Sequence, residues 1–321
     1  LPSHNTRHRK LGGLVMTAHS TALSRDKVRL GITPTLWWND DFLSIDIGIP
    51  FEQCVSEMAL AGFEGCSVGH KYPKDPAVLK AALELRGLSV SEPWVSTYFT
   101  IKEMRDQTLA NVSQQLDFIQ AVGGKDLVVA EFGQAVNPLP VAVFANRPIF
   151  ENDQWKALYD GLNQVGHMAN QRGMRLCYHP HMGTGVNIAS DIDRLMEGTS
   201  PDLVHLLLDT GHLFFAGVDP LAVTKKYGHR IKHIHLKNNR AAIVEQARAK
   251  GWSFQTSVEN GVFTVPGDPE GCIDFPPILA ALAAARFEGW LVVEAEQDPA
   301  KATPLRYAKM AREYLRQELG W

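Results

Sequence analysis

The chain has 321 residues, of which 45% are hydrophobic and 21% are charged, a composition typical of a globular protein with a sizeable core. The formal net charge is only -3 and the pI is about 6.5, so the chain lacks the excess of lysine and arginine expected for a nucleic-acid or anionic-membrane partner. The sequence has no run of about 18 apolar residues, which excludes a membrane-spanning helix. The composition therefore favours a small neutral ligand as the partner.

The sequence begins with a polar segment, and we expect residues 1–26 to form a disordered arm. This segment lacks the apolar stretch of a secretory signal. The four cysteines lie far apart, in or beside apolar runs, and form no Cys-x-x-Cys pair; they are Cys54, Cys66, Cys177 and Cys272. This pattern predicts free thiols in a reducing compartment, and hence a cytoplasmic protein.

Beyond the arm, eight short apolar runs have the character of buried strands. The predicted strands lie in residues 28–37, 65–70, 87–96, 126–132, 174–181, 203–209, 230–237 and 290–296. Between them, residues 109–119 and 155–169 carry apolar side chains at intervals of 3 and 4, which predicts helices with one buried face. Asp75 marks a predicted helix start, and Gly87 and Gly173 mark helix ends.

Eight alternating strand and helix units over roughly 290 residues predict a (β/α)8 TIM barrel, with residues 27–321 forming a single domain. Continuous apolar strands require a parallel sheet that helices cover. The alternative, an open doubly wound sheet, calls for a glycine-rich GxGxxG turn after the first strand. Residues 32–41, ITPTLWWNDD, contain no such turn.

Polar side chains follow the predicted strands, whereas the first halves of these strands are almost purely apolar. In a TIM barrel the active site lies at the ends of the strands, so one polar rim indicates an enzyme. The rim positions are Trp37, Trp38, Asn39, His70, Lys71, Glu92, Trp94, Ser96, Glu131, His179, His181, Asp209, His212, His233, His235, Lys237, Asn238, Glu294 and Glu296.

The last four strands offer an imidazole, a carboxylate, an imidazole and a carboxylate at the same level, in the runs YHPH, LLLDTGH, IKHIHLK and VVEAE. Four such ligands can converge on one divalent cation, and the mixture of nitrogen and oxygen suits Mn²⁺, Fe²⁺, Co²⁺ or Zn²⁺ better than Ca²⁺. Asp209 alone has a second interpretation, since an aspartate before a turn often caps the next helix. The company of His235 and Glu294 favours the metal, and we expect His233 to have a structural role.

Several strings carry a resemblance to a known family, and they run from about Val28 to Pro299. These are ITPTLWWNDD, VGHKYP, YHPHMGT, LLLDTGHLFFAG, VPGDPEGCIDF and LVVEAEQDP. Together they resemble the xylose-isomerase-like TIM barrels, a group of sugar epimerases, isomerases and inosose dehydratases. The resemblance implies metal ligands from strands five to eight as Glu, Asp, His and Glu, which places Asp209, His235 and Glu294 in the last three positions. The first position holds His179, with His181 or Glu131 as substitutes.

The joint set of strings is most similar to the inosose dehydratases. This implies removal of water from 2-keto-myo-inositol (scyllo-inosose) to give a trihydroxycyclohexane-dione in inositol catabolism, with Mn²⁺ or Co²⁺ as the favoured cation. Such a dehydration needs a group that removes the α-proton and a group that protonates the departing hydroxyl.

The proposed proton-transfer groups are Lys237, His212, His181 and Glu131. Lys237 is expected to stabilise the enolate or to act as the base, His212 and His181 to protonate the hydroxyl, and Glu131 to serve as a reserve base. Substrate contacts are expected from Trp38, Asn39, His70, Lys71 and Glu296, although the tryptophan also fits a place in the core, and His70 and Lys71 also fit an exposed loop tip.

Two other functions compete with the dehydratase. A metal-dependent ketose epimerase or isomerase would use two carboxylates on opposite faces of a sugar, and the histidine at position 179 counts against it. A non-catalytic sugar-binding barrel would have lost ligands, and only that one substitution is visible. The sequence is compatible with a homo-oligomer but does not determine its size.

Overall fold

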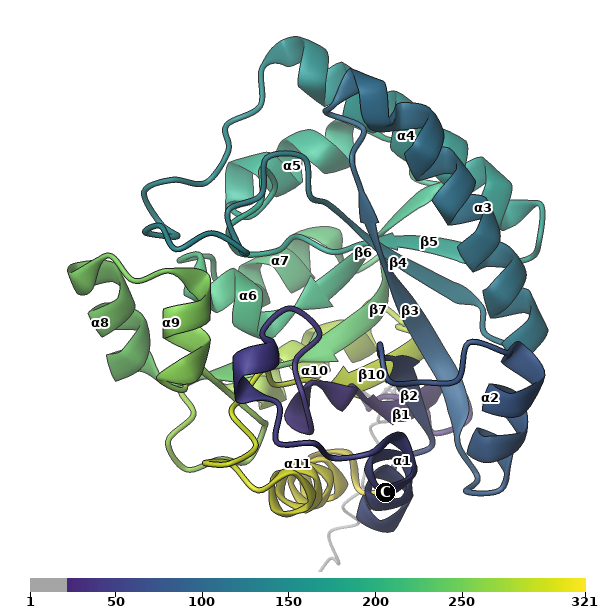
Figure 1. Cartoon of the computed structure of the whole chain (residues 1–321), viewed down its shortest axis with the longest axis vertical. Helices are drawn as coiled ribbons and strands as arrows, with labels where there is room; N and C mark the ends of the chain where they lie inside the picture. The colour runs from purple at the N-terminus through teal and green to yellow at the C-terminus, as the bar shows by residue number, and fades with distance from the viewer. Residues whose placement is uncertain (1–21) are drawn as a thin grey trace, which may run out of the picture.

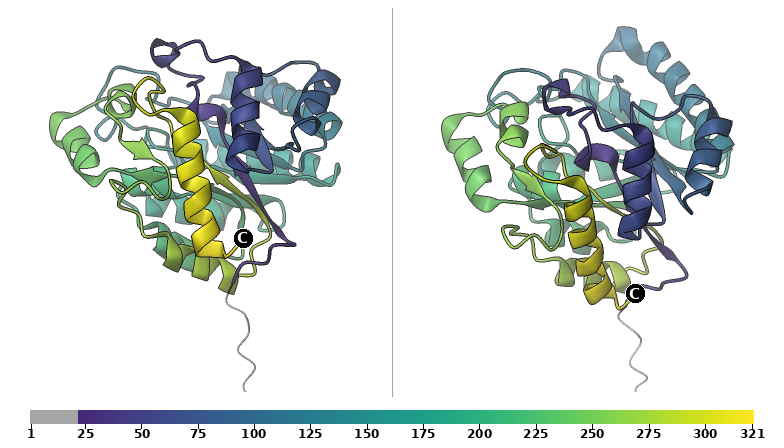
Figure 2. Two further views of the ribbon diagram at one scale, coloured as in Figure 1. Left: turned by 90° about the horizontal axis from the view of Figure 1, so that it is seen from below. Right: turned by 60° about the horizontal axis from the view of Figure 1, so that its bottom comes forward.

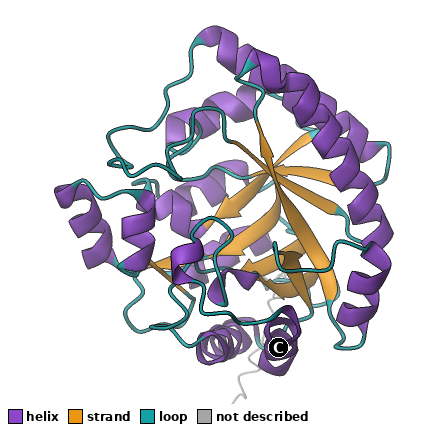
Figure 3. Ribbon diagram, in the orientation of Figure 1, coloured by secondary structure: helices purple, strands orange, loops and turns teal. Residues whose placement is uncertain are grey.

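The computed structural model describes residues 22–321, in which eight parallel strands close into a barrel (Figures 1 and 3). The strands are β1 (Val28–Ile32), β2 (Gly65–Val68), β3 (Ser89–Thr97), β4 (Asp126–Glu131), β5 (Arg175–Tyr178), β6 (Val204–Asp209), β7 (Ile231–Leu236) and β10 (Gly289–Val293). Around the barrel their order is β1-β10-β7-β6-β5-β4-β3-β2. Each predicted run contributes one strand, so the predicted TIM barrel is confirmed.

Helices surround the barrel, and the two strongest periodic patterns, 109–119 and 155–169, lie inside α3 and α4. The helices around the barrel are α1 (Phe51–Ala61), α2 (Pro76–Glu84), α3 (Arg105–Val122), α4 (Asn152–Asn170), α5 (Ala189–Gly198), α6 (Thr210–Phe215), α7 (Pro220–Tyr227), α10 (Phe275–Ala284) and α11 (Pro304–Leu319). Asp75 caps α2 by accepting hydrogen bonds from the backbone N–H groups of Ala77 and Val78. None of the helices in residues 22–321 has the length and apolar character needed to cross a bilayer.

The segment between β7 and β10 builds a small structure beside the barrel (Figure 2). It contains β8 (Asn238–Asn239), α8 (Ala241–Lys250), α9 (Phe254–Glu259) and β9 (Phe263–Thr264), and β8 pairs antiparallel with β9. Phe254 and Phe263 join Phe42 and Phe215 in an apolar cluster separate from the main core. This cluster fixes the α8–α9 segment against the end of the barrel that carries the polar rim.

The N-terminal arm predicted for residues 1–26 lies mostly outside the described residues. In residues 22–26 the chain already packs, because Leu23 is only 7% exposed and belongs to the main core. The carbonyl of Ser24 also accepts a hydrogen bond from the backbone N–H of Val28 at 3.0 Å. Within the described chain, the packed structure therefore begins before residue 27.

Candidate active site

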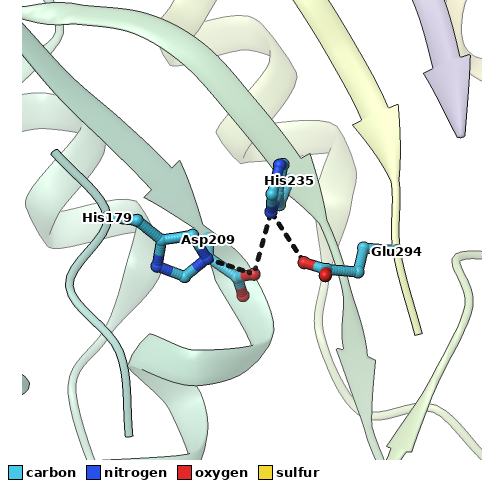
Figure 4. A group of neighbouring side chains, drawn as sticks. All are labelled: His179, Asp209, His235 and Glu294. Carbon is cyan, nitrogen blue, oxygen red and sulfur yellow. Dashed lines mark ion pairs between the residues drawn. The ribbon is translucent and has the colours of Figure 1, made fainter. Parts of the chain in front are cut away.

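Four buried side chains converge at the ends of consecutive strands (Figure 4). Asp209 and His235 are register partners on β6 and β7, while His179 and Glu294 directly follow β5 and β10. His179 Nε2 lies 3.4 Å from Asp209 Oδ2, and His235 Nδ1 lies 3.6 Å from Asp209 Oδ2 and 2.6 Å from Glu294 Oε2. One ligand atom of each residue lies within 4.8 Å of the others.

Asp209 uses its two carboxylate oxygens differently. Oδ1 accepts a hydrogen bond from the backbone N–H of His212 at 2.8 Å and so caps α6. Oδ2 points to the centre of the four side chains and accepts no hydrogen bond. Oδ1 therefore fulfils the capping interpretation, while Oδ2 is left unpaired for the predicted metal.

The donor atoms fit a divalent cation. Asp209 Oδ2, His235 Nδ1 and Glu294 Oε2 are buried without a hydrogen-bond partner, although a buried polar atom normally has one. The short approach of His235 to Glu294 lacks hydrogen-bond geometry, as expected for two atoms that face a common third point. Two imidazoles and two carboxylates are a ligand set suited to a first-row transition metal.

Lys237 lies directly behind this centre with its side chain fully buried. Its Nζ is 2.8 Å from Glu296 Oε2 and 2.8 Å from His212 Nε2. It also lies 3.2 Å from Glu294 Oε2 and 3.6 Å from Asp209 Oδ2. The ammonium therefore compensates the charge of three carboxylates that share a space from which water is largely excluded.

The charges around Lys237 hold it in the ammonium form. Burial acts to lower the pKa of Lys237, but Asp209, Glu294 and Glu296 outweigh burial and raise it. For Asp209, burial acts to raise the pKa, and the charges of Lys237 and His212 outweigh burial and hold it well below its usual range. Lys237 also lies outside the pocket lining, and this position argues against the general-base role that the sequence left open for it.

A pocket opens above the convergent side chains and encloses about 720 Å³ free of protein atoms, part of it open to solvent. His179, His235 and Glu294 form part of its wall. Of the other predicted site residues, Asn39, His181 and Glu296 line it, whereas Lys237 and His212 lie behind the wall. The rest of the lining is Thr33, Pro34, Thr35, Asp40, Asp41, Ser67, Val68, Glu92, Trp94 and Val128.

His181 is the imidazole that reaches this pocket without belonging to the four convergent side chains. Its Nδ1 lies 3.0 Å from the carbonyl oxygen of Met182, an acceptor, and 3.1 Å from Asn137 Nδ2, a donor, so both of these contacts engage Nδ1 and not Nε2. Burial, followed by the neighbouring His212 and His179, holds the pKa of His181 well below its usual range. The imidazole is therefore neutral near pH 7 and able to accept a proton.

Three predicted substrate contacts lie outside the pocket lining. Trp38 is fully buried, and its indole N–H donates to Asp40 Oδ1 at 3.0 Å. His70 pairs with the same carboxylate at 2.5 Å, and Lys71 Nζ lies 2.7 Å from Asp46 Oδ2. Through these contacts the three residues hold the loop after β1 in place. The polar rim therefore contains structural as well as functional groups.

Glu131 also turns away from the pocket. Its carboxylate accepts hydrogen bonds from the hydroxyls of Thr97 and Thr100 and from the backbone N–H groups of Phe99 and Thr100, at 2.7–3.0 Å. With both oxygens bonded to the loop after β3, Glu131 fixes that loop. The geometry therefore does not support its predicted roles as a reserve base or substitute ligand.

Glu92 and Trp94, which the sequence places on the polar rim, and Asp41 were given no specific role from the sequence, yet all three line the pocket. Glu92 and Trp94 are both on β3, where the period of two places them on the same side of the strand, and Glu92, as the charged residue of that strand, was the available signal. Asp41 follows Asn39 in the run WWNDD. Trp94 stands edge-on to His179 and His181, with ring centroids 5.4 and 5.5 Å away.

Comparison with known proteins identifies a family, relatives and a solved structure that are similar to this chain. The model of the family described as xylose isomerase-like TIM barrel matches residues 53–318. The chain is 49% identical to an inosose dehydratase of Geobacillus thermodenitrificans and 47% identical to one of Clostridium tetani; each match covers 92% of this chain and 98% of that protein. A solved structure of the IOLI protein with a binding zinc atom has a TM-score of 0.68 at 15% identity, over 91% of this chain and 98% of that one.

Proposed function

Because the chain belongs to the xylose isomerase-like TIM barrels, and within them to the inosose dehydratases, we propose that it removes water from 2-keto-myo-inositol. The product is a trihydroxycyclohexane-dione, and the reaction belongs to inositol catabolism. The observation that carries the proposal is the set of unpaired, buried donor atoms at the base of the pocket. We further propose that residues 27–321 act as one catalytic domain.

The four convergent side chains would hold the divalent cation, which is Mn²⁺ or Co²⁺, with Fe²⁺ and Zn²⁺ as alternatives of the same ligand preference. When bound, such a cation polarises the ketone of the substrate and stabilises negative charge on its oxygen. The zinc described for the IOLI protein supports a divalent ion in a barrel of this fold.

Dehydration of a β-hydroxy ketone moves a proton from the α-carbon to a base, and the electron pair left behind expels the β-hydroxyl, which leaves as water after protonation. His181 is suited to both proton transfers. Its neutral Nε2 accepts the α-proton, and the imidazolium that results then protonates the departing oxygen. The residue lines the pocket next to His179, with ring centroids 5.3 Å apart.

Glu296 and Lys237 have a complementary role. Glu296 lines the pocket and is bonded through Oε2 to the Lys237 ammonium at 2.8 Å. This pairing holds the carboxylate in place to accept a hydrogen bond from a substrate hydroxyl. Lys237 thus orients Glu296 and Glu294 from behind the pocket wall.

The test is an activity measurement on protein stripped with a chelator and reloaded with Mn²⁺ or Co²⁺. Incubation with 2-keto-myo-inositol should produce the ultraviolet absorbance of the dione, and incubation with free ketoses should produce no epimers. Asp209→Asn should abolish both bound metal and dione formation, while circular dichroism reports an intact barrel. Epimer formation from ketoses, without dione formation, would replace the dehydratase by the epimerase alternative.

A further inference from the structure

A line of polar side chains, most of them buried, runs through the barrel interior from the candidate metal centre toward the opposite end. It consists of Glu92 on β3, His233 on β7, Asp126 on β4 and Arg175 on β5. The first three are at most 2% exposed. Buried charges are costly unless they are paired. A continuous line of them inside an apolar barrel is therefore expected to have a function that offsets this cost.

Glu92 is the member of this line that contacts the metal centre. Its two oxygens lie against two histidines of the same strand: Oε1 is 3.2 Å from His235 Nε2, and Oε2 is 3.2 Å from His233 Nε2. The histidines are two positions apart on β7, so both point into the barrel and His233 lies one step deeper. Glu92 therefore contacts His235 through Nε2, whereas Nδ1 is the nitrogen that lies near Asp209 and Glu294.

The deeper part of the line continues through His233. Its second nitrogen, Nδ1, lies 2.9 Å from Asp126 Oδ2. Arg175 then holds Asp126 with two hydrogen bonds, Nε to Oδ1 at 2.7 Å and Nη2 to Oδ2 at 2.9 Å. This bidentate pair fixes the orientation of the Asp126 carboxylate.

The hydrogen bonds along the line determine where the proton of His235 resides. His233 Nδ1 donates to Asp126 Oδ2, which can only accept, whereas His233 Nε2 lies 3.2 Å from Glu92 Oε2 without a hydrogen bond. Glu92 makes its hydrogen bond through Oε1, to His235 Nε2 at 3.2 Å. Glu92 Oε1 remains an acceptor, so the proton of a neutral His235 belongs on Nε2 and the lone pair on Nδ1.

We propose that Glu92 is a positioning residue, which holds His235 in the tautomer and ring orientation that present Nδ1 to a divalent cation. His233, Asp126 and Arg175 fix Glu92 from behind. The inference rests on the metal site of the proposed function but not on the identity of the substrate. Carboxylates that orient a ligating histidine in this way affect metal affinity by about 10- to 100-fold.

One experiment reads the tautomer directly. In zinc-loaded protein labelled with ¹⁵N in its histidines, His235 should show a protonated Nε2 and a metal-bound Nδ1, with His235→Gln used to assign its signals. The opposite pattern, with zinc on Nε2, would overturn the inference. The measurement needs no variant at position 92, so it stands even where such a variant folds poorly.

A second experiment measures zinc affinity of the metal-free protein by competition with a chromophoric chelator. Glu92→Met removes both acceptors and should weaken zinc binding by about 10- to 100-fold. Glu92→Gln should lose less than about 10-fold, because its amide oxygen still accepts from His235 while its NH₂ group donates to a neutral His233. Wild-type affinity in folded Glu92→Met would overturn the inference.

The control is Asp268→Asn, which changes a buried carboxylate bonded to Arg240 and Thr264 at the side of the barrel. It should lower the unfolding temperature without changing zinc affinity, and so separates loss of stability from loss of positioning.

Asp209→Asn distinguishes failure of the proposed metal site from failure of the role proposed for Glu92. If that variant keeps its zinc, the proposed metal site fails; if it loses zinc while Glu92→Met binds normally, only the role of Glu92 fails.

Discussion

At the end of β5, His179 supplies an imidazole where the family resemblance implies a glutamate. Its Nδ1 lies 2.8 Å from the carbonyl oxygen of Pro180, which leaves Nε2 to face Asp209. His179→Ala removes one of four donors and should weaken metal binding severely, whereas His179→Glu should retain metal and change which ion is preferred, because an oxygen replaces a nitrogen. Titration of metal-free protein with Mn²⁺, Co²⁺ and Zn²⁺ gives the answer. Unchanged affinity in the alanine variant would remove His179 from the ligand set.

His181 is expected to act on protons and not on the metal. His181→Gln keeps a polar side chain of similar reach but cannot take up a proton, so kcat should fall by about 10²- to 10⁴-fold while the metal content stays at that of the wild type. The variant should also fail to exchange the α-proton of 2-keto-myo-inositol with deuterated solvent. Exchange at the wild-type rate, followed by nuclear magnetic resonance, would assign the base elsewhere.

Lys237 should show a different combination of effects. Lys237→Met keeps most of the apolar stem but removes the charge that compensates Asp209, Glu294 and Glu296, so kcat should fall by about 10²- to 10⁴-fold in a folded, metal-binding protein. Because His181 is the proposed base, exchange of the α-proton should persist in this variant. Lost exchange would restore Lys237 as the base, and turnover near wild type would remove it from the mechanism.

At the scale of elements, the start of α6 is shaped by Lys237, the residue that directly follows β7. A Cβ on Gly211 would lie 2.4 Å from Lys237 Cγ, so even an alanine requires the buried lysine stem to move. Gly211→Ala should cost about 1–3 kcal/mol of stability and lower kcat, although alanine favours helices over glycine by about 1 kcal/mol. Denaturant unfolding and steady-state kinetics test this. A stabilised variant with normal kcat would show that the lysine has room to shift.

The α8–α9 segment is a second element that completes the site. Phe254 of α9 lies parallel to the His212 ring at a centroid distance of 5.9 Å and approaches His181 at 5.5 Å. The insertion therefore provides an apolar wall that shields these imidazoles from water and contributes to their low pKa values, for which burial is the main cause.

At the scale of the whole molecule, positively charged side chains lie near His205 on β6, at the barrel end opposite the pocket, and they affect its pKa. Burial, then Lys232 and Arg175, lowers the pKa of His205 to about 4, from an unfolded value of about 6.5. Between these values the unfolded chain binds more protons than the folded one, so stability rises with pH in this window. The contribution is fully present above about pH 6.5 and is lost as the pH falls to about 4.

His205→Gln should therefore flatten the dependence of the unfolding free energy on pH between about 6.5 and 4. Urea unfolding of the wild type and the variant at matched pH values measures the difference, in which contributions from the other buried histidines cancel. Identical pH profiles for the two proteins would show that His205 is not protonated differently in the folded and unfolded chains.

The sequence by itself determined the architecture, because each apolar run and each periodic helix is a local pattern, and eight alternating units close in one way. It also predicted that His179, Asp209, His235 and Glu294 meet, since residues at the ends of neighbouring parallel strands share one rim. The structure brings these four side chains together, and three of them, His179, His235 and Glu294, line the pocket.

Only the tertiary structure decided which rim residues enter the pocket and which support it. Glu131 turns to the loop after β3, and Lys237 lies behind Glu296, while Glu92 crosses the barrel to reach His235. These directions depend on strand register and on packing against partners far away in sequence. The period of a strand gives the face on which a side chain lies, but not the partner that it meets across the barrel.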